Sequence, residues 1–231
     1  MIFIIIESVI YISFIILDLW GLAPAVSDLI KYTGIILVFA HALIMFLKDR
    51  TAIDRLIVSA LFFTAIADIF LLFFPDLYLP GLASFCVTQS IYTVVTTRSS
   101  DRVSRIVVPI AVLFICICVA VFSGLLNSDP SLFFLVILLP YYAVLFILNT
   151  VRSWINYRRS AVRADFIFAL GLTLFVLCDI NVLIRNINGF YSHIIPASIS
   201  SAAVFLSWFF YLPSQVLISW RTRFSDSDFF S

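Results

Sequence analysis

A single carboxylate interrupts the apolar run Thr64-Ala65-Ile66-Ala67-Asp68-Ile69-Phe70-Leu71-Leu72. The segment around it, about 55–75, has the composition of a membrane span, and an ionisable side chain inside such a segment is costly in lipid and usually functional. The same arrangement returns in Leu177-Cys178-Asp179-Ile180-Asn181-Val182-Leu183. Two acids inside two corresponding apolar segments therefore define both the fold class and the functional question.

The composition is that of a protein surrounded by lipid. Hydrophobic residues make up 63% and charged residues 12% of the 231 positions, and the mean hydropathy is +1.16. Soluble domains are about half apolar and about a quarter charged. The net charge of +1 gives no reason to expect a nucleic-acid partner. The four cysteines fall inside apolar segments without a CxxC pair or a nearby His, so we expect no metal and no cofactor.

Eight apolar segments are long enough to cross a hydrocarbon core of about 30 Å as helices. They predict an all-α polytopic membrane protein with eight transmembrane helices, forming a single transmembrane domain over residues 1–231. The expected spans are about 2–20, 30–47, 55–75, 79–97, 106–126, 131–150, 164–185 and 197–220.

The basic residues predict the orientation. With eight spans, all of them except Lys31 and Arg185 fall near the termini or in connections on the same side as the termini. The positive-inside rule then places both termini in the cytoplasm, and we expect an integral protein of a bacterial plasma membrane. The connection 151–163 is the most basic, and we expect the basic connections to meet anionic lipid headgroups.

Polar stripes at helical spacing run along the fourth and the last spans. Gln89 and Tyr92 share one helix face, with Gln89 at about the depth of Asp68, and Tyr211 and Gln215 share a face of the last span. Polar side chains in a membrane face other helices. They either form hydrogen bonds between helices or line a cavity that holds the acids.

The two acidic segments suggest an internal repeat. Aligning residues 60–73 with 171–184 superposes Asp68 on Asp179, and each segment is followed by a span with a polar stripe. Both segments run in the same direction, so a repeat would be a parallel 4+4 arrangement about an axis along the membrane normal. Sequences built mainly from a few apolar residue types match one another easily by chance. The alternative is therefore that the two halves are unrelated.

Paired acids in a membrane favour a few kinds of chemistry. Lipid favours the protonated form of a carboxyl group, and two acids in one cavity would together hold one proton. One proton donor and one proton acceptor are what the hydrolysis of an acid-sensitive C–O bond requires. A transporter or proton-coupled carrier that uses the same acids, and a non-catalytic bundle held by hydrogen bonds, are the alternatives.

These residues resemble the YhhN family of eight-span membrane proteins, which includes the lysoplasmalogenases. The resemblance covers the whole chain in the number and order of spans, with Lys31 at the mouth of the second. It rests on Ala67-Asp68-Ile69-Phe70-Leu71-Leu72, Gly81-x-x-x-Phe85-x-x-x-Gln89-x-x-Tyr92, Cys178-Asp179 and Tyr211-x-x-x-Gln215-x-Leu217-Ile218.

The resemblance implies hydrolysis of the vinyl-ether bond of a lysoplasmalogen, with a membrane lysolipid as the partner. Asp68 and Asp179 would be the proton donor and the water-activating base, in an order that stays open, and Lys31 would attract the phosphate of the substrate. The further candidate residues for substrate binding or the cavity are Gln89, Tyr92, Asn181, Tyr211 and Gln215.

The chain also departs from the family pattern in two places. Gln89 stands where the family has a His, and Ala67 stands where it has a Gly. A Gln side chain can orient a carboxylate or a water, but it does not change charge near pH 7. If the family His moves protons, this chain is expected to be slow, altered in substrate or inactive.

Overall fold

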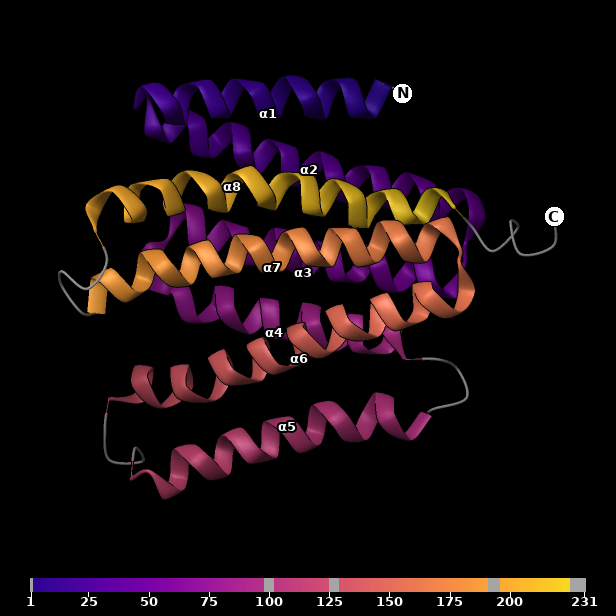
Figure 1. Ribbon diagram of the computed structural model, residues 1–231, viewed down its shortest axis with the longest axis vertical. Helices are drawn as coiled ribbons and strands as arrows, with labels where there is room; N and C mark the ends of the chain where they lie inside the picture. The colour runs from indigo at the N-terminus through magenta and orange to yellow at the C-terminus, as the bar shows by residue number, and fades with distance from the viewer. Residues whose placement is uncertain (1, 98–101, 125–128, 191–195, 225–231) are drawn as a thin grey trace.

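The computed structural model describes residues 2–97, 102–124, 129–190 and 196–224, and these ranges are helices joined by short turns. The helices are α1 (Ile2–Trp20), α2 (Pro24–Asp49), α3 (Ala52–Phe73), α4 (Tyr78–Thr96), α5 (Arg102–Phe122), α6 (Pro130–Ser160), α7 (Arg163–Phe190) and α8 (Ala197–Trp220). The first residues of α1 and the last of α8 lie at the same end of the bundle (Figure 1). We call this the termini end and the opposite one the far end.

Seven of these helices are long and apolar enough to cross a membrane, as judged on the described residues. The remaining helix is α4, whose sequence includes Thr88, Gln89 and Thr93. All three side chains are fully buried, so the polar content of α4 lies inside the protein. The prediction of an all-helical, multi-pass membrane protein is confirmed, and α4 is a helix of the bundle whose polar residues face other helices.

Two helices extend well beyond the predicted spans. α2 begins at Pro24 rather than near residue 30, because a proline suits the first turn of a helix. α6 continues to Ser160 rather than ending near residue 150, because its last turns pack on the bundle. The Trp154 indole donates to Thr173 Oγ1 at 2.9 Å, and Asn156 Nδ2 donates to the Thr96 carbonyl at 2.7 Å. Most of the predicted connection 151–163 is therefore helix.

The helix neighbours follow a two-fold pattern. In the first half α1 packs on α2, α2 on α3 and α3 on α4, and in the second half α5 packs on α6, α6 on α7 and α7 on α8. Between the halves, α2 and α1 touch α8, and correspondingly α6 and α5 touch α4. Figure 1 shows α1 and α5 at opposite edges of the bundle. This pattern supports the parallel 4+4 repeat.

The turn between the second and third helices of each half gives independent support for the repeat. α2 ends at Asp49 and α3 begins at Ala52, while α6 ends at Ser160 and α7 begins at Arg163, so the same spacing that superposes the acids superposes both turns without a gap. Arg50 follows α2 and Ala161 follows α6. Both residues have a left-handed backbone, with φ of 53° and 55°.

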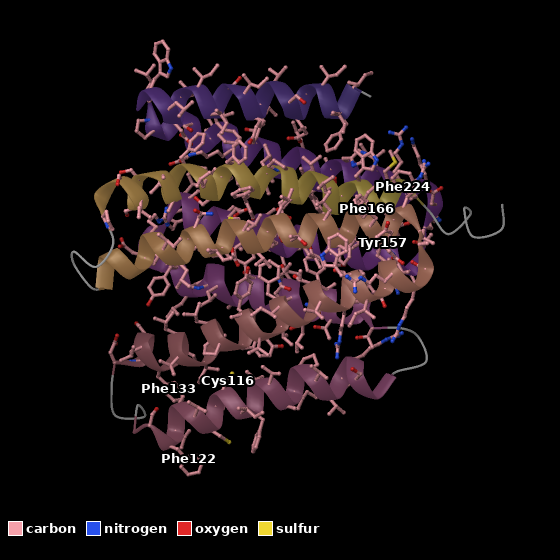
Figure 2. All side chains as sticks on the ribbon, viewed as in Figure 1. Cys116, Phe122, Phe133, Tyr157, Phe166 and Phe224 are labelled. Atoms are coloured by element: carbon pink, nitrogen blue, oxygen red, sulfur yellow. The ribbon has the colours of Figure 1, made fainter. Side chains whose placement is uncertain are left out.

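Apolar side chains fill the interior of the bundle and also cover its outside. Leu172 is fully buried, whereas Phe122 is 88% exposed and points away from the other helices (Figure 2). Among the described glycines the tightest helix contact is at Gly171 in α7, where an added Cβ would lie 2.9 Å from Ile218 Cγ1 and 3.1 Å from the Ser214 carbonyl oxygen of α8. Small residues at such crossings let membrane helices approach closely.

Candidate functional site

The first acid lies between α3 and α8. Asp68 is 4% exposed, and the Tyr211 hydroxyl donates a hydrogen bond to its Oδ2 at 2.7 Å. The hydroxyl reaches Asp68 because α8 packs beside α3 as well as α7. Two of the predicted site residues, far apart in the sequence, are therefore in direct contact. A buried carboxyl group that accepts a hydrogen bond from a phenol is held in one orientation.

The second acid lies between α7 and α6. The Tyr142 hydroxyl donates to Asp179 Oδ2 at 2.5 Å. Tyr142 was not among the predicted site residues, although a signal for it existed. The gap-free alignment that places Asp68 on Asp179 also places Tyr142 at the position of Lys31, which was predicted to belong to the site. Each acid thus has a tyrosine partner on a neighbouring helix.

Aromatic rings lie between the two Asp–Tyr pairs. Phe175 of α7 is 5.4 Å from the Tyr211 ring and 5.7 Å from the Phe85 ring of α4, and Phe85 is 5.9 Å from the Tyr142 ring. Each acid is therefore held by its own tyrosine, packed aromatic rings lie between the two pairs, and the two acids do not form a hydrogen-bonded dyad.

Gln89 belongs to a different cluster, between α4 and α6. Asn149 Nδ2 donates to Gln89 Oε1 at 3.1 Å and to its carbonyl oxygen at 2.8 Å. The hydroxyls of Thr93 and Thr96 donate to Asn149 Oδ1 at 3.0 Å and 3.2 Å. All four residues are buried. Gln89 is therefore oriented by Asn149, and its described contacts do not include Asp68.

The other predicted cavity residues lie apart from the acids. The Tyr92 ring stacks edge-on against Phe168 with 5.5 Å between ring centroids, and within the described ranges its buried hydroxyl has no hydrogen-bond partner. Gln215 Nε2 donates to Ser214 Oγ at 3.2 Å, next to it in α8. Asn181 Nδ2 donates to the Leu177 carbonyl of its own helix at 2.7 Å. Of the polar stripes, only Tyr211 contacts an acid.

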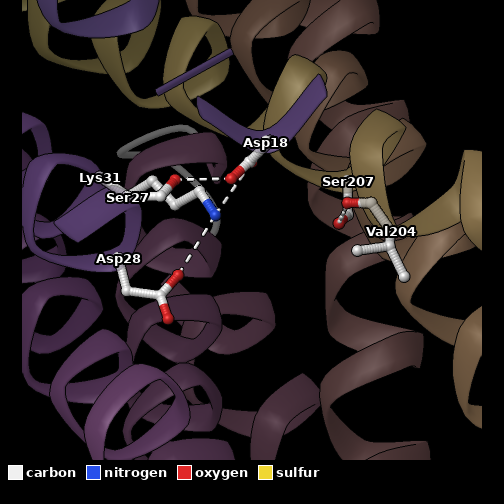
Figure 3. A network of polar contacts seen from close by, with 6 residues as sticks. All are labelled: Asp18, Ser27, Asp28, Lys31, Val204 and Ser207. Atoms are coloured by element: carbon white, nitrogen blue, oxygen red, sulfur yellow. Dashed lines mark hydrogen bonds and ion pairs between the residues drawn. The ribbon is translucent and has the colours of Figure 1, made fainter. Parts of the chain in front are cut away.

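Lys31 is held between two carboxylates at the far end. Its Nζ lies 3.0 Å from Asp18 Oδ2 and 3.2 Å from Asp28 Oδ1, and the Ser27 hydroxyl donates to Asp18 Oδ1 at 2.5 Å (Figure 3). Nζ also lies over the Trp208 ring, 5.2 Å from its centroid. The sequence reasoning missed Asp18 and Asp28 as partners, and they compensate the positive charge that was expected to attract a phosphate.

A chain of contacts leads from this cluster to the first acid. Lys31 lies over Trp208, the Trp208 ring packs edge-on against Tyr211 at 5.2 Å, and Tyr211 bonds to Asp68. The Lys31 cluster also borders a cavity of about 290 Å³ between α1, α2 and α8. Within the ranges that the structure describes, no three His, Cys, Asp or Glu side chains gather into a metal site.

The fold and these groups define a multi-pass helical membrane protein with ionisable side chains inside its bundle. The chain belongs to the YhhN family, whose model matches residues 26–222. Every residue of the two Asp–Tyr pairs lies within the matched region, as do Lys31 and Gln89. No curated protein and no solved structure matches the chain.

Proposed function

We propose that this protein is an integral-membrane hydrolase that cleaves the vinyl-ether bond of lysoplasmalogen-type lysolipids. Membership of the YhhN family supports this class of activity, because the family includes the lysoplasmalogenases. The observation that carries the proposal is the pair of carboxyl groups inside an apolar bundle, Asp68 on Tyr211 and Asp179 on Tyr142. Such groups are costly in a membrane and are kept for function.

The reaction needs one acid, one base and one water. Protonation of the vinyl carbon that is not bonded to oxygen gives an oxocarbenium ion. Water then adds to the carbon bonded to oxygen and loses a proton to the base, which leaves a hemiacetal. As the C–O bond of the hemiacetal breaks, the hemiacetal hydroxyl loses its proton and the departing glycerol oxygen gains one, which releases a fatty aldehyde and the glycerophospho-headgroup alcohol. One of the two aspartates supplies the first proton and the other accepts the proton of the water.

Each tyrosine is a positioning residue in this scheme. Tyr211 and Tyr142 hold one oxygen of their carboxyl group and leave the other oxygen for proton transfer. The substrate headgroup lies in the cavity beside Lys31, and the contacts through Trp208 and Tyr211 connect that cavity to Asp68. The residues Gln89, Tyr92, Asn181 and Gln215 lie outside the lining of this cavity, and we keep them as proposed contacts of the lipid chain or of water deeper in the bundle.

The test is aldehyde release from a lysoplasmalogen by the purified protein. We expect activity in the wild type and a loss of about 10²–10⁴-fold in Asp68→Asn and in Asp179→Asn, the range for removal of a general acid or base. Asp49→Asn, at an exposed site on the termini end, is the matched control and should retain full activity. Folded, monodisperse variants that keep wild-type turnover would refute the roles of the aspartates.

A proton-coupled carrier is the second candidate, because the two-fold pattern of helix neighbours is also what parallel-repeat transporters have. It predicts proton flux in liposomes that depends on Asp68 and Asp179, without release of aldehyde. If neither activity is present and both Asn variants lose only stability, the acids belong to a non-catalytic bundle.

The proposed orientation has both termini in the cytoplasm. The basic residues near the termini end support it, since Lys48, Arg50 and Arg158 all lie on the last turns or caps of helices that end there. These side chains are also the proposed contacts of anionic lipid headgroups. A reporter fused to the C-terminus that is active only outside the cytoplasm should be inactive.

A further inference from the structure

The side-chain amide of Gln89 is held in one orientation. Asn149 Nδ2 donates to the backbone carbonyl of Gln89 at 2.8 Å, and since a carbonyl oxygen only accepts, this end of Asn149 is the donor. The same Nδ2 lies 3.1 Å from the Gln89 side chain, whose facing atom is therefore the acceptor Oε1. The other end, Nε2, is buried and has no hydrogen-bond partner among the described residues. Gln89 thus has two unused N–H donors.

Gln89 lies one helical turn from the second Asp–Tyr pair. It follows Phe85 by four residues in α4, so the two side chains share a helix face. The Phe85 ring lies 5.9 Å from the ring of Tyr142, whose hydroxyl holds Asp179. Both α4 and α6 run toward the termini end (Figure 1), and Asn149 lies beyond Tyr142 in that direction. Asn149 occupies the termini side of the amide, which leaves Nε2 for the side of Asp179.

The amide of Gln215 is held the opposite way round, beside the first pair. The Ser214 hydroxyl donates its one hydrogen to the Tyr211 carbonyl at 2.6 Å, so toward Gln215 its oxygen acts as an acceptor. The Gln215 atom that lies 3.2 Å from it is the donor Nε2. Oε1 is buried and, in the part of the chain that the structure describes, has no partner. Gln215 follows Tyr211, which holds Asp68, by one turn of α8.

A free donor and a free acceptor have opposite effects on a neighbouring carboxyl group. A donor stabilises the ionised carboxylate, whereas an amide oxygen repels the carboxylate and accepts a hydrogen bond from the protonated acid. Such dipoles act strongly inside a protein, where little water screens them. Both acids accept a hydrogen bond from a tyrosine, so the tyrosines do not distinguish them. The two amides do.

We propose that Asp179 is the ionised, water-activating base and Asp68 the protonated acid, with Gln89 and Gln215 as positioning residues. The inference rests on the proposed function for the reaction itself. Asp68 gives its proton to the vinyl carbon, and Asp179 takes a proton from the water, whose oxygen accepts from Gln89 Nε2. When the hemiacetal breaks, Asp179 returns its proton to the departing glycerol oxygen and Asp68 takes the hydroxyl proton. Both acids then regain their starting states.

The test is isotope-edited infrared spectroscopy at neutral pH of the full-length protein in a maltoside detergent, which has no carbonyl group. Labelling the aspartate carboxyl groups with ¹³C separates their bands from those of Glu7 and the backbone. We expect one protonated-acid C=O band to be lost in Asp68→Asn and retained in Asp179→Asn. Loss of the band in Asp179→Asn, in both variants or in neither would overturn the assignment.

The two amides provide a matched pair of variants in which both acids remain. Gln215→Met preserves the length of the side chain and removes its acceptor, so the Asp68 C=O band should shift. Gln89→Met removes the donor beside the ionised acid and should leave that band unchanged. A shift in both, in neither, or in Gln89→Met alone would contradict the proposal. This comparison does not depend on whether the Asn variants fold.

Aldehyde release separates this inference from the proposed function. In an active protein, Gln89→Met should lower kcat up to roughly tenfold with KM unchanged, because it removes one hydrogen bond from the reacting water. An unchanged kcat, or a change in KM alone, would refute the role of Gln89. The expected infrared pattern without any aldehyde release would refute the proposed function and retain the assignment of the protonated and the ionised acid.

Discussion

The two Asp–Tyr bonds allow a direct measurement of whether the acids differ in protonation. The perturbation is a pair of double-mutant cycles, one with Tyr211→Phe and Asp68→Ala, the other with Tyr142→Phe and Asp179→Ala. Each Phe variant removes only the hydroxyl and preserves ring contacts such as the 5.4 Å contact between residues 175 and 211. The coupling energy of each cycle then reports the hydrogen bond itself.

The magnitude depends on the charge of the acceptor. Hydrogen bonds between neutral side chains of membrane helices average about 0.6 kcal/mol in such cycles, whereas hydrogen bonds to charged groups are worth about 1.5–3 kcal/mol. The proposed mechanism needs one protonated acid and one carboxylate. We therefore expect one coupling near the lower value and the other in the upper range.

The assay is reversible unfolding in mixed micelles with increasing SDS, followed by circular dichroism at neutral pH. Tyr157→Phe is the matched control, because the contacts described for Tyr157 are ring contacts with Trp154 and Phe166 and do not involve its hydroxyl. Couplings below about 0.3 kcal/mol in both cycles, which is the scatter of additive sites, would show that the two bonds are not formed. Two equal, substantial couplings would refute the assignment of different protonation states.

Three further substitutions test the packing and the polar clusters. Gly171→Ala should destabilise the bundle by about 1–3 kcal/mol through overpacking, as measured by SDS unfolding, and Gly34→Ala should cost less because its close neighbours are the ends of flexible side chains. Asn149→Leu should cost about 2 kcal/mol, the loss of several interhelical hydrogen bonds, and a change below about 0.5 kcal/mol would contradict the cluster. Lys31→Met should cost about 2–3 kcal/mol because two carboxylates lose their shared cation, and adding Asp18→Asn should restore part of the stability.

The membrane fold was predictable because its signals are local in the sequence. Apolar length predicted the helices, and all eight are present among the residues that the structure describes. Boundaries were less accurate where tertiary contacts decide them. α6 extends to Ser160 because its last turns bond to α4 and α7, and no pattern within 151–163 contains that information.

The candidate site was predictable in its residue types but only partly in its pairings. Asp68 and Tyr211 could be chosen individually, since each is a polar group in an apolar helix. Their contact depends on α8 lying beside α3, which helical spacing does not encode. Gln89 has the same kind of spacing, yet it bonds to Asn149, a residue whose importance appears only when α4 and α6 pack together. Periodicity identifies the inward face of a helix, and packing decides its partner.

The proposed repeat would place the two acids in equivalent helices, and the surroundings of the two acids differ. The alignment that superposes Asp68 on Asp179 superposes Lys31 on Tyr142. In one half this position is an ammonium group, paired with Asp18 and Asp28 at the far end. In the other half it is a phenol that bonds directly to the acid.

Because position 31 is a lysine and not a tyrosine, the hydroxyl that bonds to Asp68 comes from Tyr211 of α8. A symmetric pair has equal intrinsic affinities for a proton, so which member is protonated is decided only by the coupling between the two acids. Both acids accept a hydrogen bond from a tyrosine, but the tyrosines come from different helices, and unequal surroundings are what the proposed division into acid and base requires. If the two halves are a repeat, the difference between Lys31 and Tyr142 is the position at which the surroundings of the two proposed catalytic acids diverge.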